Sequence, residues 1–264
     1  MTTNEMVLQH LDNGLLTITM NRPDRRNALS PDMTRGLVEA ARRAAEDQEV
    51  RAVLLKGAGG TFCVGGDVKS MAAGRAPMSF EEKQVNLRKG MEVSRILHQM
   101  NKPVVAQLDG AAAGAGLSIA LSCDLRIASE SCKITTAFAK VGFSGDYGGT
   151  YFLTKMLGSA KARELYFLSD RVSADEALRL GLANWVVEPD ELAAKTREVA
   201  ARLAKGPIVA YRYMKENLNR AMAGEWDDCM DLEATHHVHC GQTHDHKEAA
   251  KAFVEKREPV FEGR

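Results

Sequence analysis

The first half of the sequence alternates short apolar segments with longer segments of helical character, and this alternation limits the fold more than any other feature. Apolar runs at residues 52–56, 103–108 and 125–128 are expected to be strands covered on both faces, because such strands lack polar alternation. Predicted helices at residues 30–47 and 80–100 separate them. Strands that alternate with helices predict βαβ units and a mostly parallel sheet.

Local turn and capping signals support this reading. Residues 7–10 and 15–20 flank Asn13-Gly14 and predict a β-hairpin at the N-terminal end. Ser30 is expected to cap the first helix, with Pro31 at its first position.

The strand signal nearly stops after Gly149. One strand is expected at residues 184–187, and helical patterns occupy most of the remainder, at residues 150–157, 160–168, 174–180, 192–205, 207–223 and 244–256. The sequence therefore predicts an α/β core over residues 1–195 and a helical C-terminal lobe over residues 196–264.

Composition narrows the functional classes. Lysine plus arginine and aspartate plus glutamate are 35 each, so there is no basic excess of the kind that a nucleic-acid-binding protein shows. The most apolar run, residues 110–121, is too short and glycine-rich to cross a membrane. The five cysteines form no CxxC pair, which argues against a disulfide framework or a zinc knuckle. With no signal-peptide pattern at the N-terminus, we expect a reducing, cytoplasmic location.

Two glycine-rich turns, at residues 57–66 and 109–116, each follow a predicted strand and precede a predicted helix. Neither ends in Gly-Lys-Ser/Thr like a P-loop, and neither fits the dinucleotide fingerprint GxGxxG. Backbone amides at a helix start have no partner within the helix. Two such starts that meet at one oxygen would form an oxyanion hole, whereas the alternative is a pair of ordinary tight turns.

These turns belong to a larger set of motifs that resembles the crotonase family, the enoyl-CoA hydratase/isomerase superfamily. The motifs are residues 21–29, Phe62-Cys-Val-Gly-Gly66-Asp67, Lys102-Pro103, residues 110–116 with Cys123-Asp124, Gly148-Gly149-Thr150, Leu157-Gly158, residues 174–182 and residues 243–257. The resemblance implies a crotonase-like spiral of ββα repeats with a C-terminal helical trimerisation region. It implies a homotrimer or a dimer of trimers that acts on an acyl-CoA, with coenzyme A as part of the substrate and no separate cofactor or metal.

The same resemblance assigns site residues by motif position. The oxyanion-hole amides fall on Gly66 and Ala115. Residues expected to contact the acyl-CoA, several of which have ordinary turn, core or surface roles as the alternative, are Arg25, Arg26, Val64, Asp67, Phe138, Phe143, Tyr147, Phe253 and Lys256. Residues 72–86 are expected to shape the acyl pocket, with Met71, Met78, Met91 and Met100 beside it.

Two positions depart from the family's hydratases. Those enzymes carry two glutamates that hold a water over the double bond, and here the two positions are Ser118 and Phe138. Syn-hydration needs one group to deprotonate the water and another to supply the α-proton. Neither serine nor phenylalanine replaces them, so ordinary hydration is in doubt.

Asp146 offers a different chemistry. It matches the position of a catalytic aspartate in some isomerases of the family, and one base suffices to move a proton between two carbons. Neighbouring aromatic residues would raise its pKa by burial. The alternative is that Asp146 caps the helix that starts near Gly149. Ser144 lacks the GxSxG context of a nucleophile.

We therefore expect enoyl-CoA isomerisation with Asp146 as acid and base. The alternatives are an enoyl-CoA hydratase that uses Asp146 and a water, an acyl-CoA hydrolase or ring-cleaving enzyme, and a non-catalytic acyl-CoA-binding trimer. A histidine-rich run at residues 236–246 is read as a loop before the last helix, with Thr243 or Asp245 as its cap, rather than as a zinc site.

Overall fold

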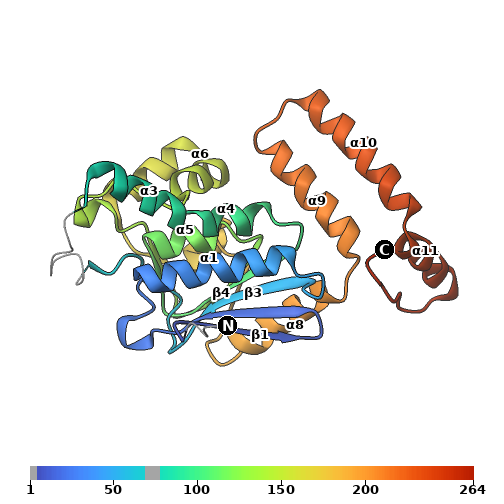
Figure 1. Ribbon diagram of the computed structural model, residues 1–264, viewed down its shortest axis with the longest axis horizontal. Helices are drawn as coiled ribbons and strands as arrows, with labels where there is room; N and C mark the ends of the chain where they lie inside the picture. The colour runs from blue at the N-terminus through green and yellow to red at the C-terminus, as the bar shows by residue number, and fades with distance from the viewer. Residues whose placement is uncertain (1–4, 69–77) are drawn as a thin grey trace.

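Six strands form the main sheet of the computed structural model, which describes residues 5–68 and 78–264 (Figure 1). In spatial order they are β1 (Val7–Asp12), β2 (Leu15–Met20), β3 (Ala52–Gly57), β4 (Val104–Leu108), β6 (Leu125–Ser129) and β9 (Trp185–Val187). The β1–β2 hairpin is antiparallel and the other four pairs are parallel. The predicted hairpin and parallel sheet are thus confirmed.

A second, smaller sheet runs beside the first in the order β5 (Ala111–Ala113), β7 (Lys133–Thr135) and β8 (Val172–Ser173). Each of β4 and β6 in the main sheet is followed along the chain by a strand of this smaller sheet and then by a helical turn. This is the ββα repeat that the resemblance implied. The pattern analysis missed these strands, because they are two or three residues long and β5 lies within a run of alanines.

Helices cover both faces of the main sheet. The major core lies between the sheet and a layer that includes α1 (Pro31–Glu46), α4 (Glu92–Gln99) and α5 (Ala115–Leu121). On the opposite face, α8 (Leu192–Ala204) buries Leu192, Ala200 and Ala204 against the sheet (Figure 1). The remaining elements of this part are η1 (Pro23–Arg25), α3 (Phe80–Gly90), η2 (Ala139–Val141), α6 (Gly149–Leu168) and α7 (Ala174–Arg179).

Two helix predictions need adjustment. The single helix expected over residues 80–100 is two, α3 and α4, separated at Met91. A β-carbon on Gly90 would stand 2.7 Å from the Thr34 side chain and 2.9 Å from the Tyr147 hydroxyl, so the break coincides with a close approach. Conversely, the two helices expected around Gly158 appear as α6 with a kink at that glycine.

Three C-terminal helices extend away from the sheet: α9 (Ile208–Ala221), α10 (Trp226–Gln242) and α11 (His244–Glu255) (Figure 1). Lys215 joins α9 to the core, because its ammonium donates to Asp124 Oδ2 at 2.8 Å and to the Leu97 carbonyl at 2.9 Å. The expected loop before the last helix is wrong, since residues 236–242 belong to α10. Of the two proposed caps, Thr243 accepts from the His246 amide.

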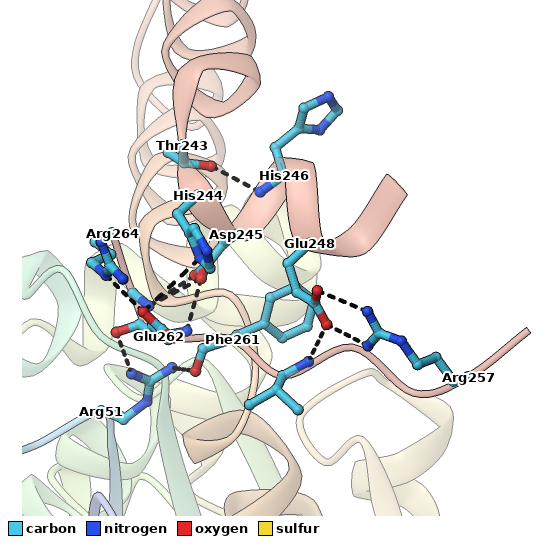
Figure 2. A network of polar contacts seen from close by, with 12 residues as sticks. Arg51, Thr243, His244, Asp245, His246, Glu248, Arg257, Phe261, Glu262 and Arg264 are labelled. Carbon is cyan, nitrogen blue, oxygen red and sulfur yellow. Dashed lines mark hydrogen bonds and ion pairs between the residues drawn. The ribbon is translucent and has the colours of Figure 1, made fainter. Parts of the chain in front are cut away.

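The chain end returns to the base of this lobe (Figure 2). Asp245 is buried and accepts hydrogen bonds from the amides of Glu262 at 2.8 Å and Gly263 at 2.9 Å. Arg51, at the start of β3, donates to the carbonyls of Phe261 and Glu262 at 3.3 Å. The tail thereby links α11 to the sheet.

The predicted division at residue 195 falls inside α8, and the division into core and lobe stays a prediction. No helix within residues 5–68 and 78–264 is both long and apolar enough to cross a bilayer.

Candidate active site

A cavity of about 560 Å³ opens where the two glycine-rich turns meet the segment before α6. Gly66, Ala115 and Asp146 all line it. Its wall is otherwise largely apolar, with Phe138 and Leu87 among the contributors. The structure thus brings the three predicted catalytic residues to one cavity, although they lie far apart along the chain.

Hydrogen bonds hold the two turns against each other. The Cys63 amide donates to the Ala111 carbonyl at 3.0 Å, and the Ala113 amide donates to the Cys63 carbonyl at 2.9 Å. Gly116 permits this approach, since a β-carbon there would stand 2.3 Å from the Cys63 carbonyl oxygen. Gly65, at φ +85°, has the Ala113 oxygen 2.8 Å from where its β-carbon would be.

The amides of Gly66 and Ala115 are left without acceptors among residues 5–68 and 78–264. Ala115 is the first residue of α5, where helical geometry offers the amide no carbonyl. Two unpaired N–H groups that border the same cavity can donate to one oxygen and stabilise negative charge on it. The arrangement is consistent with an oxyanion hole.

Asp146 contributes a half-buried carboxylate to the same cavity. Burial raises the pKa of this carboxyl from 3.8 to about 6. Its Oδ1 is buried without a hydrogen-bond partner in the described chain. The capping alternative is wrong, because Gly148 is the N-cap residue of α6 and no side chain caps that helix. A carboxylate with a pKa near neutrality suits general acid–base chemistry.

Of the two positions at which family hydratases carry glutamates, Phe138 lines the cavity and Ser118 is buried beside it. Ser118 is buried and donates to the Gly114 carbonyl at 3.3 Å. Phe138 lines the cavity and stacks on Tyr166 with 5.9 Å between ring centroids. Within the described residues, Asp146 is the one carboxylic acid that lines the cavity.

A second cavity of about 490 Å³ adjoins the first and shares Val64 and Gly66 with it. Arg25, Arg26 and Asp67, all predicted to contact the substrate, line this second space. Asp67 is buried and its Oδ2 lies 2.8 Å from Nη1 of Arg22, so part of its charge is balanced within the protein. The arginines supply positive charge beside the oxyanion-hole candidate.

Three predicted substrate contacts line neither of these two cavities. Tyr147 is buried and lines a separate hollow next to α4. Phe253, 86% exposed, and the exposed Lys256 belong to the end of α11, at the opposite end of the molecule from α3 (Figure 1).

Phe143 is exposed and lines the main cavity of about 560 Å³, together with the neighbouring Ser144. Met71 and much of the segment 72–86 lie outside the described residues.

The histidine-rich run packs between helices. His236 shares a hydrogen bond with Asn217 Oδ1 at 2.5 Å and stacks on Tyr213 of α9. In the described part of the chain, no group of three or more histidine, cysteine, aspartate or glutamate side chains is placed to hold a metal ion.

Lys83, which lies in the segment 72–86 that was expected to shape the acyl pocket, lines the cavity from α3. Two further residues were not expected there: Leu87, which also lines the cavity from α3, and Tyr166, which lies behind Phe138. No motif marked them. Whether a helix residue lines the cavity depends on how whole helices pack together. The spacing of residues along the chain does not reveal that packing.

Comparison with known proteins identifies the family and supports the fold. The family model described as enoyl-CoA hydratase/isomerase matches residues 10–264. The 1,2-epoxyphenylacetyl-CoA isomerase of Escherichia coli K12 is 35% identical, over 98% of this chain and 99% of the relative. The short-chain-enoyl-CoA hydratase of Clostridium acetobutylicum is 35% identical over 97% of each chain. A crystal structure of an enoyl-CoA hydratase from Polaromonas sp. JS666 superimposes with a TM-score of 0.91 at 30% identity, over 97% and 99% of the two chains.

The spiral fold and the paired amides define a protein of the crotonase type. The chain belongs to the enoyl-CoA hydratase/isomerase family. The relatives named above comprise an isomerase and hydratases, so membership fixes the acyl-CoA-processing class and leaves the reaction open.

Proposed function

We propose that this protein is an enoyl-CoA isomerase that moves a carbon–carbon double bond with Asp146 as its acid and base. The proposal rests on the lining of the main cavity, to which the described residues contribute two amides without acceptors and one carboxylic acid, whose pKa is raised to about 6. Isomerisation needs one proton-transfer group, whereas syn-hydration needs two.

The reaction would proceed through an enolate. The Asp146 carboxylate takes a proton from C2 of a 3-enoyl-CoA, and the electron pair moves into the thioester carbonyl. The resulting dienolate oxygen accepts hydrogen bonds from the amides of Gly66 and Ala115. Protonated Asp146 then returns the proton to C4, and the double bond comes to rest between C2 and C3. Removal of one oxyanion-hole donor in other enzymes costs about 3 kcal/mol of barrier, which indicates the weight of this contact.

A hydratase that uses Asp146 and a water is the second candidate, because relatives of equal identity carry hydratase names. The substitution of both glutamate positions argues against it. Names among the relatives also include a trans-2-decenoyl-[acyl-carrier-protein] isomerase of Streptococcus mutans, which supports double-bond movement within this family.

The acyl-CoA is proposed to lie across both cavities, with the thioester at Gly66 and the phosphates near Arg25 and Arg26. Arginine guanidinium groups are well suited to phosphate. We further propose a homotrimer, or a dimer of trimers, in which the exposed Phe253 and Lys256 reach a neighbouring subunit. Light scattering after gel filtration tests this: a monomer at micromolar concentration would contradict it.

Incubation with 3-enoyl-CoA, 2-enoyl-CoA and saturated acyl-CoA, followed by mass and absorbance, tests the reaction. Isomerisation predicts an unchanged mass with a rise in the absorbance of the conjugated thioester. A gain of one water would establish hydration in its place. Released coenzyme A would indicate hydrolysis, and binding without any product would leave an inert acyl-CoA-binding protein.

A further inference from the structure

Tyr166 lies directly behind the lining of the main cavity. Its ring stacks on Phe138, with an interplanar angle of 6°. The hydroxyl edge of the ring borders the backbone that leads into Asp146, because a β-carbon on Gly145 would stand 2.9 Å from Cε1 and 3.2 Å from the hydroxyl oxygen of Tyr166. The side chain therefore lies close to two residues of the cavity wall.

The hydroxyl of Tyr166 is buried and has no hydrogen-bond partner within residues 5–68 and 78–264. It lies under the first residue of α6, since a β-carbon on Gly149 would stand 2.6 Å from this oxygen. The same point is 2.3 Å from Oγ of Ser118. The hydroxyl thus shares its surroundings with the serine that stands at a hydratase glutamate position.

Asp146 directly follows Gly145, and its buried Oδ1 also has no hydrogen-bond partner among the described residues. The two groups interact electrostatically: burial raises the pKa of the Tyr166 hydroxyl, and the negative charge on Asp146 raises it further. Buried polar groups in native proteins nearly always have a hydrogen-bond partner, so a donor and an acceptor left open in one neighbourhood imply a link between them.

We propose that Tyr166 is a positioning residue for Asp146, with its hydroxyl donating to the Oδ1 atom of the carboxylate through one internal water. This role rests on the proposed function of Asp146 as the base. The hydrogen bond would orient the carboxylate toward the cavity. Because a donor stabilises the ionised form, it would also lower the pKa of Asp146 below the value that burial alone imposes.

The competing role for Tyr166 is packing alone, in which the ring supports Phe138 and the hydroxyl has no effect on Asp146. Tyr166→Phe keeps the ring and removes the donor, so it separates the two. Tyr151→Phe is the matched control, because Tyr151 is on the same helix, is 40% exposed and does not line the main cavity.

The test is a ¹³C NMR titration of the Asp146 carboxyl carbon, assigned from the signal that is lost in Asp146→Asn. We expect the pKa of Asp146 to rise by about one unit in Tyr166→Phe, a tenfold change in its dissociation constant, and to stay unchanged in Tyr151→Phe. Equal pKa values in the wild type and in Tyr166→Phe would overturn the proposal. The acidic limb of the pH profile of kcat/KM should likewise move to higher pH in Tyr166→Phe.

Incorporation of 3-fluorotyrosine at position 166 provides a second measurement if Tyr166→Phe does not fold. Its more acidic hydroxyl is a stronger donor, so the pKa of Asp146 should fall; a pKa that stays constant overturns the hydrogen bond. Failure of the base itself would look different. In that case Asp146→Asn would keep its activity, whatever the titration shows for Tyr166.

Discussion

A β-carbon on Gly65 would stand 3.2 Å from the amide nitrogen of Ala115. The two glycine-rich turns therefore meet with no room for a side chain between them. Each turn supplies one amide to the main cavity, so the spacing between the two donors depends on this contact. Fine control of that spacing matters because oxyanion donors act over the short range of a hydrogen bond.

Gly65→Ala is expected to lower kcat/KM by about a hundredfold or more, because the new methyl group pushes Ala115 away from the position of the oxyanion. Gly181→Ala is the matched control: Gly181 has a similar φ of +74°, and nothing lies within 4 Å of its β-carbon position. Both variants carry backbone strain. Equal activity losses in the two would show that strain, and not the contact with Ala115, causes the effect.

Ser118→Glu is expected to destabilise the protein without creating a hydratase. Ser118 is buried, and its Oγ lies against Gly149 and close to the Tyr166 hydroxyl, so there is no space for a glutamate. Overpacking of this kind typically costs about 1–3 kcal/mol of unfolding free energy, and an unpaired buried charge adds to that. Urea titration measures the loss, with Ser118→Ala as the control.

A folded Ser118→Glu protein that hydrates 2-enoyl-CoA would contradict this reading of the site. Ser118→Ala removes a 3.3 Å hydrogen bond to the Gly114 carbonyl, and its effect is expected to stay near 1 kcal/mol.

The sequence predicted the main sheet, and it marked the glycine-rich turns of the candidate site, because both carry local signals. The apolar runs that became β3, β4 and β6 can be recognised one at a time, and the glycine turns carry their own geometric requirement. In the structure β3 and β4 are adjacent and parallel, so the turns that follow them, at Gly66 and Ala115, meet at one edge of the sheet. The family resemblance supplied the pairing of these turns with Asp146.

Other features depend on contacts between distant residues, which the sequence does not report. Tyr166 resembles any half-buried aromatic residue of an amphipathic helix, and its place behind Phe138 follows from how α6 packs. The break between α3 and α4 adjoins Gly90, where Thr34 and Tyr147 come close, and neither neighbour can be identified from the sequence around Gly90. Tyr147 was predicted at the substrate, yet its backbone at φ +51° places the side chain in the neighbouring hollow.

The raised pKa of Asp146 is expected to make the unfolding free energy of the protein depend on pH. Its folded-state pKa of about 6 lies above the ordinary 3.8, so the native state binds this proton more tightly than the unfolded chain does. The resulting stabilisation is complete below the ordinary pKa and is lost as pH rises through about 6. At pH 8, Asp146→Asn should therefore unfold with a free energy higher by up to about 3 kcal/mol.

Urea titrations of the wild type and Asp146→Asn at several pH values check this sign. The advantage of the variant should shrink as the pH falls from 8 to 4. An advantage that is constant with pH would mean that the proton of Asp146 plays no part in it.

The tail contact in Figure 2 should govern the order of the chain end. Asp245→Ala removes the acceptor for the amides of Glu262 and Gly263. Hydrogen bonds to a charged group contribute about 1.5–3 kcal/mol, so amide exchange in residues 258–264 should quicken by at least tenfold. Arg264→Ala, which removes an exposed ion pair with Glu262, is the control and should leave most of this protection. Similar exchange in both variants would contradict the anchoring role of Asp245.

Loss of proton exchange in Asp146→Asn tests the central claim most directly. Wild-type protein with 3-enoyl-CoA in D₂O should introduce deuterium at C2 and C4 in those turnovers in which the proton on Asp146 exchanges with solvent before it is returned to carbon, as followed by proton NMR. The account predicts that Asp146→Asn binds acyl-CoA with nearly unchanged affinity and exchanges about a thousandfold more slowly. Exchange at the wild-type rate in this variant would contradict the assignment of Asp146 as the base.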